Sequence, residues 1–186
     1  MVPVLSLVLP IVLSAVLVFV ASSVMHMLLR YHWSDLKRFP NEDAIMNALR
    51  PLHLMPGDYS LPHAGSPEGL KAPEFVEKMK KGPVAFVTVA PSGPPSMGGP
   101  LAAWFAYALL VGVFAAYISG RALGPGANYL EVFRFVGATA FMGYGMALLQ
   151  NSIWWKRNWP MTLKSVADGL VYALLTAGTF GWLWPR

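Results

Sequence analysis

Residues 5–29 read LSLVLPIVLSAVLVFVASSVMHMLL, and no Asp, Glu, Lys or Arg occurs before Arg30. A helix of about 20 apolar residues crosses the hydrocarbon core of a bilayer, so this stretch predicts a spanning helix from about Pro3 to Leu29. Pro10 is tolerated inside it where neighbouring groups satisfy the freed carbonyl. The stretch lacks the basic start of a secretory signal and its apolar run is too long for one, which predicts that the helix is retained.

The composition of the whole chain supports a membrane location. Of its 186 residues, 55% are hydrophobic and 12% are charged, whereas a soluble domain carries about 25% charged residues. Residues 82–120 and 135–155 also lack charged side chains. Three such runs predict an integral membrane protein. The chain has no cysteine, which excludes a disulfide framework and thiolate chemistry.

Three further spanning helices are expected after the first. They cover about Leu101–Gly120, Tyr129–Trp155 and Thr162–Trp184, and the short SGRALGPGAN turn makes the first two of them antiparallel neighbours. The predicted fold class is an all-α membrane protein with four transmembrane helices and a small α+β extramembrane segment between helices 1 and 2. The corresponding boundaries are 1–29 for transmembrane helix 1, 30–99 for the extramembrane segment and 100–186 for transmembrane helices 2–4.

The extramembrane segment predicts two short helices. FPNEDAIMNALR (39–50) has Asn41 as its cap, and APEFVEKMKKG (72–82) has Gly82 as its stop. Residues 54–67 are rich in turn formers. PVAFVTVAP (83–91) is too short to cross a bilayer; a strand, a segment lying on the membrane and the edge of a small αβ unit all fit it.

The basic residues predict the orientation. Four crossings put residues 30–99 and 151–165 on one side, and the termini and residues 121–128 on the other. Of the 14 Lys and Arg residues, only Arg121, Arg134 and Arg186 fall on the second side. The positive-inside rule then places the first side in the cytoplasm and the termini in the periplasm.

The stretch NSIWWKRNWPMTLKS (151–165) is then a cytoplasmic hairpin at the membrane surface. Tryptophans lie at headgroup depth and basic side chains face anionic lipid. Specific lipid binding or partner docking would use the same side chains, but plain anchoring is the favoured interpretation. The residues concerned are Trp154, Trp155, Lys156, Arg157, Trp159 and Lys164.

Three charged residues near the ends of the predicted helices are candidate intramembrane groups. Asp168 could carry protons or bind a cation, although a local ion pair with Lys164, four residues earlier, or an interaction with the positive end of the helix dipole is the favoured interpretation. Glu131 and Arg134 could form a gate at the outer surface. They could equally pair with each other, which we favour, and Glu131 also suits a helix N-terminus.

A weak metal-site candidate lies at the end of helix 1, where HMLLRYHWSD contains His26, His32 and Asp35. His32 and Asp35 share a helical face, but His26 and His32 are six residues apart and point in different directions on a continuous helix. We therefore expect no metal and no cofactor. Histidines bonded to backbone or lipid are the favoured interpretation, and His53 or His63 could complete a site only through an unknown fold.

Small residues line the last three predicted helices. Gly137, Gly143, Gly145 and Gly178 are among those that allow close helix approach. They predict packing within a four-helix bundle or association with another membrane subunit. A packed bundle is favoured over a channel, because four helices cannot pack three such faces together and also enclose a sizeable polar pore.

The residues 119–128 (SGRALGPGAN) and 169–185 (GLVYALLTAGTFGWLWP) resemble those of small, uncharacterised bacterial polytopic membrane proteins with four helices. The resemblance runs through helix 1 and the last three helices; it implies a bacterial inner membrane and no particular activity. The sequence shows no nucleotide-binding, hydrolase or zinc motif. Its net charge of +5 suits a membrane surface and needs no nucleic-acid partner.

The leading functional hypothesis is a non-catalytic accessory or scaffolding subunit of a larger membrane complex, which would contact lipids and other membrane subunits or itself. The alternative is a small homo-oligomeric transporter or channel that uses Asp168 and the pair Glu131 and Arg134. A membrane-embedded enzyme using His26, His32 and Asp35 is the least supported, since no complete ligand set is evident.

Overall fold

The computed structural model describes all residues, 1–186, and the chain is mostly helical. It forms two compact units, residues 1–37 with 96–186 and residues 38–95. Each unit is described by itself. The first contains the long apolar helices, and the second contains two short helices and two strands.

Three stretches of the first unit are long and apolar enough to cross a membrane: Val4–Leu28, Gly98–Ala122 and Tyr129–Ile153, each of 25 residues. The first joins a 3₁₀ turn (Val4–Leu7), α1 (Val8–Ser23) and a π-helical turn (Val24–Leu28). The second is α4 (Gly98–Ala122), and the third joins α5 (Tyr129–Tyr144), a 3₁₀ turn (Met146–Leu148) and α6 (Leu149–Ile153). These three helices are consistent with a multi-pass membrane protein.

The expected fourth span coincides with α7 (Trp159–Trp182), a continuous helix of 24 residues. Pro160 lies in its first turn, where the missing N–H costs no intrahelical bond. Lys164 and Asp168 make this helix less apolar than the other three, and it is not among the helices that qualify as spans by length and composition.

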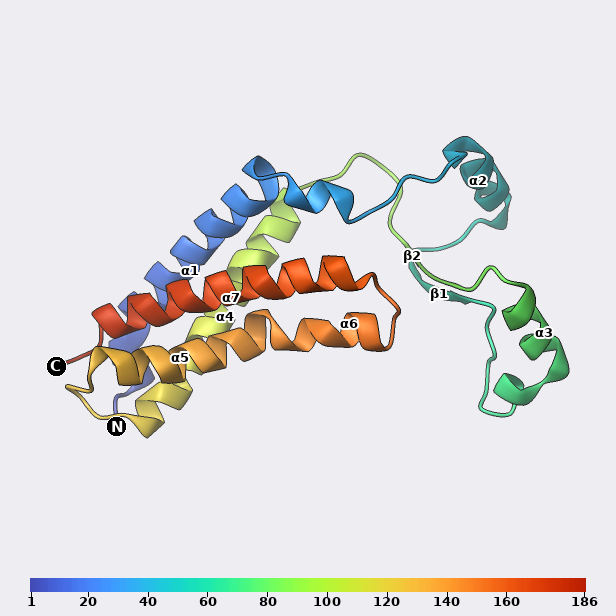
Figure 1. The fold of residues 1–186 in the computed structure, drawn as a ribbon. Helices are drawn as coiled ribbons and strands as arrows, with labels where there is room; N and C mark the ends of the chain where they lie inside the picture. Colours follow the sequence, from blue (N-terminus) through green and yellow to red (C-terminus); the bar gives the residue numbers. More distant parts are fainter. The chain divides into compact units, whose positions relative to one another are not determined.

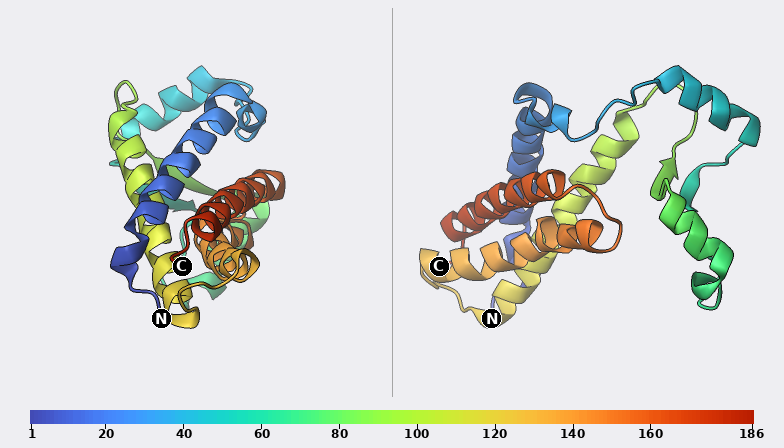
Figure 2. Two further views of the ribbon diagram at one scale, coloured as in Figure 1. Left: turned by 90° about the vertical axis from the view of Figure 1, so that its left-hand side faces the viewer. Right: turned by 45° about the vertical axis from the view of Figure 1, so that its right-hand side comes forward.

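Each of the four long helices packs against two others. α1 lies on α4 and α7, and α5 also lies on α4 and α7; Figures 1 and 2 show α5 and α7 running side by side. Fully buried side chains fill the space between them: Leu7, Val18, Val132, Val136 and Phe180. The helices thus form a packed bundle around an apolar core.

Glycine 169 permits the closest approach between α5 and α7. A Cβ atom at Gly169 would lie 2.8 Å from the Cα of Gly145 and 2.8 Å from the carbonyl oxygen of Tyr144. No side chain fits at that distance, so a glycine is required for the two backbones to meet. This contact fixes α7 beside α5 one residue after Asp168.

Both ends of the chain lie beside the last turn of α4 and the loop that follows it. The backbone N–H of Val2 donates to the carbonyl of Gly120 (2.8 Å), and the N–H of Gly126 donates to the carbonyl of Pro185 (2.8 Å). The indole N–H of Trp184 adds a bond to the Gly124 carbonyl (3.0 Å). The end of α1 and the start of α7 lie together at the opposite end of the bundle.

The second unit contains the two predicted short helices, α2 (Glu42–Leu49) and α3 (Pro73–Lys81). The Asn41 side chain caps α2 by accepting the N–H of Ala44 (3.1 Å), and Gly82 ends α3 with a φ of 63°. Both boundaries agree with the sequence. The apolar 83–91 stretch contains a strand, which was one of the alternatives left open.

That strand, β2 (Ala85–Val89), pairs in antiparallel register with β1 (Gly57–Leu61), so that Gly57 faces Val89 and Leu61 faces Ala85. β1 lies in the 54–67 stretch, where the turn formers gave no sign of a strand. No residue between 38 and 95 is buried. This unit therefore consists of a two-stranded sheet and two short helices and has no buried core of its own.

Candidate functional site

The polar site of the bundle begins with a reversal of the chain after α1. Residues 24–28 form a π-helical turn, and Arg30 adopts the left-handed conformation with φ 54°. The chain then enters a short 3₁₀ helix (Tyr31–Ser34) that turns back over the end of α1. As a result the ring of His32 stacks on that of His26, with centroids 4.5 Å apart and planes within 8°.

The prediction that these histidines point apart was wrong, because it assumed one continuous helix. The π turn and the left-handed residue break the helical period between positions 26 and 32. Left-handed backbone is uncommon for a residue other than glycine and is found at functional sites. Nothing in the sequence of residues 24–30 singled out this turn.

Asp168 enters the same site from α7 and is 4% exposed. Its Oδ2 atom lies 2.7 Å from Nε2 of His32 and 3.9 Å from Nε2 of His26. Its Oδ1 atom accepts a hydrogen bond from the Tyr31 hydroxyl. Three groups from the end of α1 and the turn that follows it therefore converge on one carboxylate of α7.

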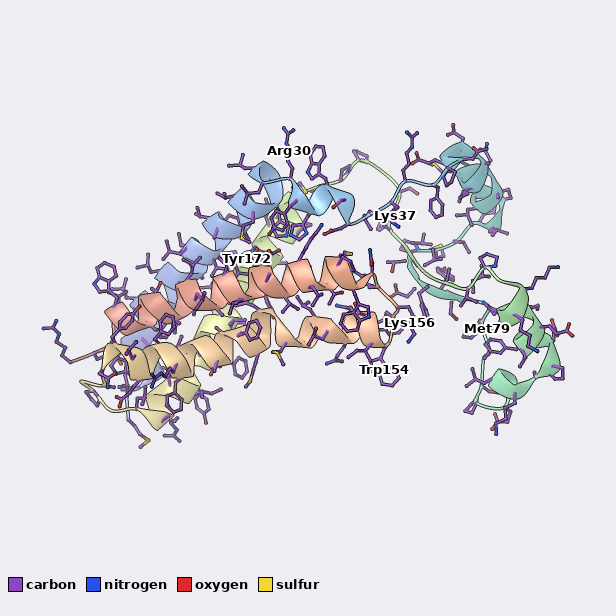
Figure 3. All side chains as sticks on the ribbon, viewed as in Figure 1. Arg30, Lys37, Met79, Trp154, Lys156 and Tyr172 are labelled. Atoms are coloured by element: carbon purple, nitrogen blue, oxygen red, sulfur yellow. The ribbon has the colours of Figure 1, made fainter.

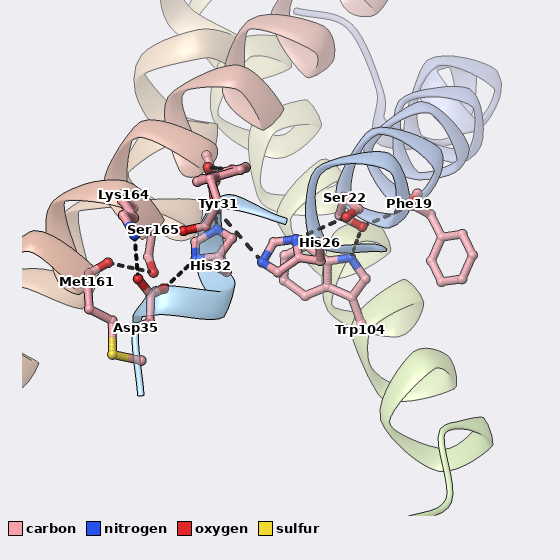
Figure 4. A network of polar contacts seen from close by, with 11 residues as sticks. Phe19, Ser22, His26, Tyr31, His32, Asp35, Trp104, Met161, Lys164 and Ser165 are labelled. Atoms are coloured by element: carbon pink, nitrogen blue, oxygen red, sulfur yellow. Dashed lines mark hydrogen bonds and ion pairs between the residues drawn. The ribbon is translucent and has the colours of Figure 1, made fainter. Parts of the chain in front are cut away.

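A second carboxylate, Asp35, holds the other side of His32 (Figure 4). Its Oδ2 atom lies 2.5 Å from Nδ1 of His32, and its Oδ1 atom accepts from the Lys164 ammonium at 2.7 Å. Lys164 also donates to the carbonyl of Tyr31 (2.7 Å) and the hydroxyl of Ser34 (2.9 Å). His32 thus bridges two carboxylates, and an imidazolium ring with a proton on each nitrogen can donate to both.

The favoured pairing of Asp168 with Lys164 was therefore wrong. The two residues are one turn apart on α7, but Asp168 bonds to the side chains of Tyr31 and His32, whereas the ion pair of Lys164 is with Asp35. A buried carboxylate gains more from several aimed donors than from one flexible ammonium. Lys164 is 29% exposed at its side chain and is used in this network, so it does not serve as a free lipid-facing cation.

The site shifts the pKa values of the groups in the turn after α1. Burial lowers the pKa of His32, but its hydrogen bonds to Asp35 and Asp168 outweigh this and raise it above the usual value. Burial raises the pKa of Asp35, but Lys164 and His32 hold it below the usual range. Burial and the hydrogen bond to Asp168 raise the pKa of the Tyr31 hydroxyl. These pKa shifts favour a charged His32, a charged Asp35 and a neutral Tyr31 hydroxyl.

His26 is fixed from its far side by α1 and α4. Its Nδ1–H donates to the carbonyl of Ser22 (3.0 Å), and its Nε2 faces Asp168. The hydroxyl of Ser22 in turn accepts from the indole of Trp104 on α4 (2.8 Å). The His26 side chain is 50% exposed, so the site is open to solvent or lipid headgroups on this side.

Tyr172 lies one turn after Asp168 on α7 and has an unusual hydroxyl. The residue is 4% exposed, yet its hydroxyl is the only buried side-chain polar atom without a hydrogen-bond partner. The rings of Trp104 and Tyr144 pack against it, each with a centroid distance of 5.7 Å. A buried unpartnered hydroxyl costs free energy, which points to a missing partner.

The structure brings together the three residues that can hold a metal ion, His26, His32 and Asp168, with one ligand atom of each within 4.8 Å of the others. The sequence analysis predicted Asp35, and not Asp168, as the third candidate metal ligand. Asp35 lies instead behind His32, as the hydrogen-bond acceptor for its Nδ1. One signal in the sequence could have linked Asp168 to these histidines. The end of helix 1 and the start of helix 4 were predicted to lie on the same side of the membrane.

The other predicted charged pair lies at the opposite end of the bundle. Glu131 forms a capping box with Asn128: the Asn128 side chain accepts from the Glu131 N–H (3.0 Å), and the Glu131 carboxylate accepts from the Asn128 N–H (3.3 Å). The favoured ion pair with Arg134 is not formed. The alternative role of Glu131 at a helix N-terminus is the one observed.

The basic and aromatic hairpin joins α6 to α7. Trp154, Trp155 and Trp159 are exposed by 71%, 56% and 48%, and Figure 3 shows Trp154 and Lys156 at this turn. Lys156 has a φ of 54° and donates to the Ile153 carbonyl (3.0 Å). The exposed rings suit the membrane interface, and anchoring by these residues and Arg157 stays a prediction.

The glycines singled out for helix packing lie against neighbouring chain segments. A Cβ atom would meet Ala177 at 3.3 Å from Gly137, Val111 at 3.1 Å from Gly143, and the Tyr129 hydroxyl at 3.6 Å from Gly178. At Gly145 it would lie 2.7 Å from the ring of Phe141. These contacts are all within the bundle.

Compared with known protein families, curated proteins and solved structures, the chain gives no significant match. Its function must therefore be argued from its own residues.

Proposed function

We propose that the chain is a four-span protein of the bacterial inner membrane that serves as a non-catalytic accessory or scaffolding subunit of a larger membrane complex. α7 would be the fourth crossing. Its 24 residues extend over ~36 Å, more than the ~30 Å of the hydrocarbon core. The hydrogen bonds that tie both termini to the last turn of α4 and the loop after it support an even number of crossings.

The orientation follows from the basic residues next to the helices. Arg30, Lys156 and Arg157 all lie at the end of the bundle that holds the polar site. Cationic residues next to short loops are retained on the cytoplasmic side. The polar site and residues 38–95 would therefore be cytoplasmic, and both termini periplasmic.

The observation that carries the accessory role is the composition of the second unit. No residue between 38 and 95 is buried, although apolar side chains are frequent there. Leu52, Met55, Leu61 and Leu70 are exposed by 60%, 73%, 53% and 56%. A cytoplasmic unit of this kind gains stability by covering these side chains against another protein. A partner subunit in the same membrane meets that need.

Transport is the alternative, and it receives less support. Glu131 is used in a helix cap, and the buried hydroxyls of Ser14, Thr176 and Thr179 bond to the backbone of their own helices. A conduction path needs polar groups free to face an ion. Asp168→Asn in a liposome flux assay separates the alternatives, because a transporter would lose flux.

The test of the accessory role is mild detergent extraction from the native membrane, followed by native electrophoresis and mass spectrometry. We expect a stoichiometric unlike partner with the wild-type chain. The double variant Met55→Gln, Leu70→Gln should lose the partner, and Glu77→Gln, an exposed polar residue of the same unit, should retain it. A band that contains only this chain would contradict the proposal.

A further inference from the structure

We propose that His26, His32 and Asp168 form a binding site for one divalent transition-metal ion of the zinc type, at the membrane surface between α1 and α7. The site is independent of the accessory role proposed above. Three ligand atoms lie close together, further hydrogen bonds hold two of the ligands, and an unpartnered buried hydroxyl lies one turn along α7.

The three ligand atoms face one another. Nε2 of His32 and Nε2 of His26 lie 2.7 and 3.9 Å from the same oxygen of Asp168. In a tetrahedral zinc site with bonds of ~2.0 Å, ligand atoms lie ~3.3 Å apart. The observed distances lie on either side of that value. An ion would replace the proton between His32 and Asp168 and draw His26 slightly inward.

Each ligand is held by a second hydrogen bond of the kind that metal sites use. The Nδ1–H of His32 donates to Asp35 (2.5 Å), and the Nδ1–H of His26 donates to the Ser22 carbonyl (3.0 Å). Donation from the far nitrogen to a carboxylate or carbonyl fixes the tautomer and directs Nε2 to the metal. Asp35 is itself held by Lys164 (2.7 Å). These contacts orient both rings before an ion arrives.

Two features provide room and access. Three protein ligands leave a fourth position of a zinc site open, and the half-exposed His26 marks the side from which an ion can enter. The Tyr172 hydroxyl is buried without a partner one turn after Asp168 on the same helix. Two imidazoles and one carboxylate favour transition metals over Mg²⁺ or Ca²⁺, which prefer oxygen ligands.

The test uses the full chain in detergent micelles, with any affinity tag removed and metals stripped by a chelator. Isothermal titration with Zn²⁺ should show one saturable site per chain. His26→Ala should weaken binding by at least ~10-fold, as should Asp35→Asn, which removes the support of His32. His63→Ala is the matched control, since His63 is exposed and bonds only to Ser60, and should bind like the wild type.

A second readout does not depend on the variants. Co²⁺ bound by the wild-type chain should give the visible absorption of a four-coordinate nitrogen and oxygen site, and Zn²⁺ should displace it. The proposal is overturned if the folded wild type shows no saturable one-to-one binding, if His26→Ala binds as tightly as the wild type, or if His63→Ala abolishes binding.

Discussion

The ring of His32 lies flat on the ring of His26, with 4.5 Å between centroids and 8° between planes, although six residues separate them on the chain. The left-handed Arg30 makes this possible. The stacked pair presents both Nε2 atoms to the Asp168 carboxylate of α7. The backbone turn at Arg30 therefore lets side chains at the end of the first long helix contact the last long helix.

Asp168→Asn should destabilise the bundle. The substitution keeps the shape of the side chain but removes the charge that the bonds from Tyr31 and His32 require. Breaking a buried, hydrogen-bonded charge pair costs about 3–5 kcal/mol, so we expect a clear fall in the thermal unfolding midpoint in detergent with chelator present. Glu77→Gln, exposed in the second unit, is the control. An unchanged midpoint for Asp168→Asn would show that the network contributes little.

The backbone turn at Arg30 can be tested separately from its side chain. Arg30→Asn and Arg30→Val both remove the cation that lies 5.3 Å over the Trp33 ring, but only asparagine tolerates a φ of 54°. The valine variant should be less stable than the asparagine variant by about 1–2 kcal/mol. It should also bind Zn²⁺ more weakly. Equal behaviour of the two would mean that the turn does not position His32.

Gly169→Ala should force α7 away from α5. The added Cβ would lie 2.8 Å from backbone atoms of Tyr144 and Gly145, which cannot rotate aside. Overpacking of this kind costs about 1–3 kcal/mol, measurable as a lower unfolding midpoint. Gly99→Ala, where a Cβ meets nothing within 4 Å, should leave the midpoint unchanged. The close-packing account fails if both variants behave alike.

The absence of cysteine makes the four-span topology testable with single introduced cysteines. We expect Arg186→Cys to react with a membrane-impermeant maleimide in intact spheroplasts. Asn158→Cys, in the loop between α6 and α7, should react only after lysis, because basic loops remain cytoplasmic. Labelling of both positions from the same side would show that α7 does not cross the membrane.

Much of the fold could be predicted from local patterns. The charge-free runs located the three helices that are long and apolar enough to span a membrane, Asn41 and Gly82 marked helix boundaries correctly, and residues 121–128 separated two long helices. Helix positions and helix ends depend on residues that are close together in the sequence. Hydropathy, capping residues and glycines therefore predict them directly.

The site could be predicted only in part, because it depends on contacts between distant segments. His26, His32 and Asp168 were each singled out, but their meeting requires the left-handed Arg30, which side-chain patterns do not encode. Local spacing suggested that Lys164 pairs with Asp168, whereas it reaches Asp35 more than a hundred residues away. β1 was missed for the same reason, since Gly57–Leu61 becomes a strand by pairing with β2.

The accessory role is tested most directly by photo-crosslinking in the native membrane. A photoreactive amino acid in place of Leu70, which is 56% exposed in the second unit, would be activated in living cells and its adducts identified by mass spectrometry. We expect one unlike membrane protein as the dominant adduct. Crosslinks only to lipid, or only to a second copy of this chain, would contradict the proposal that the protein is a subunit of a larger complex.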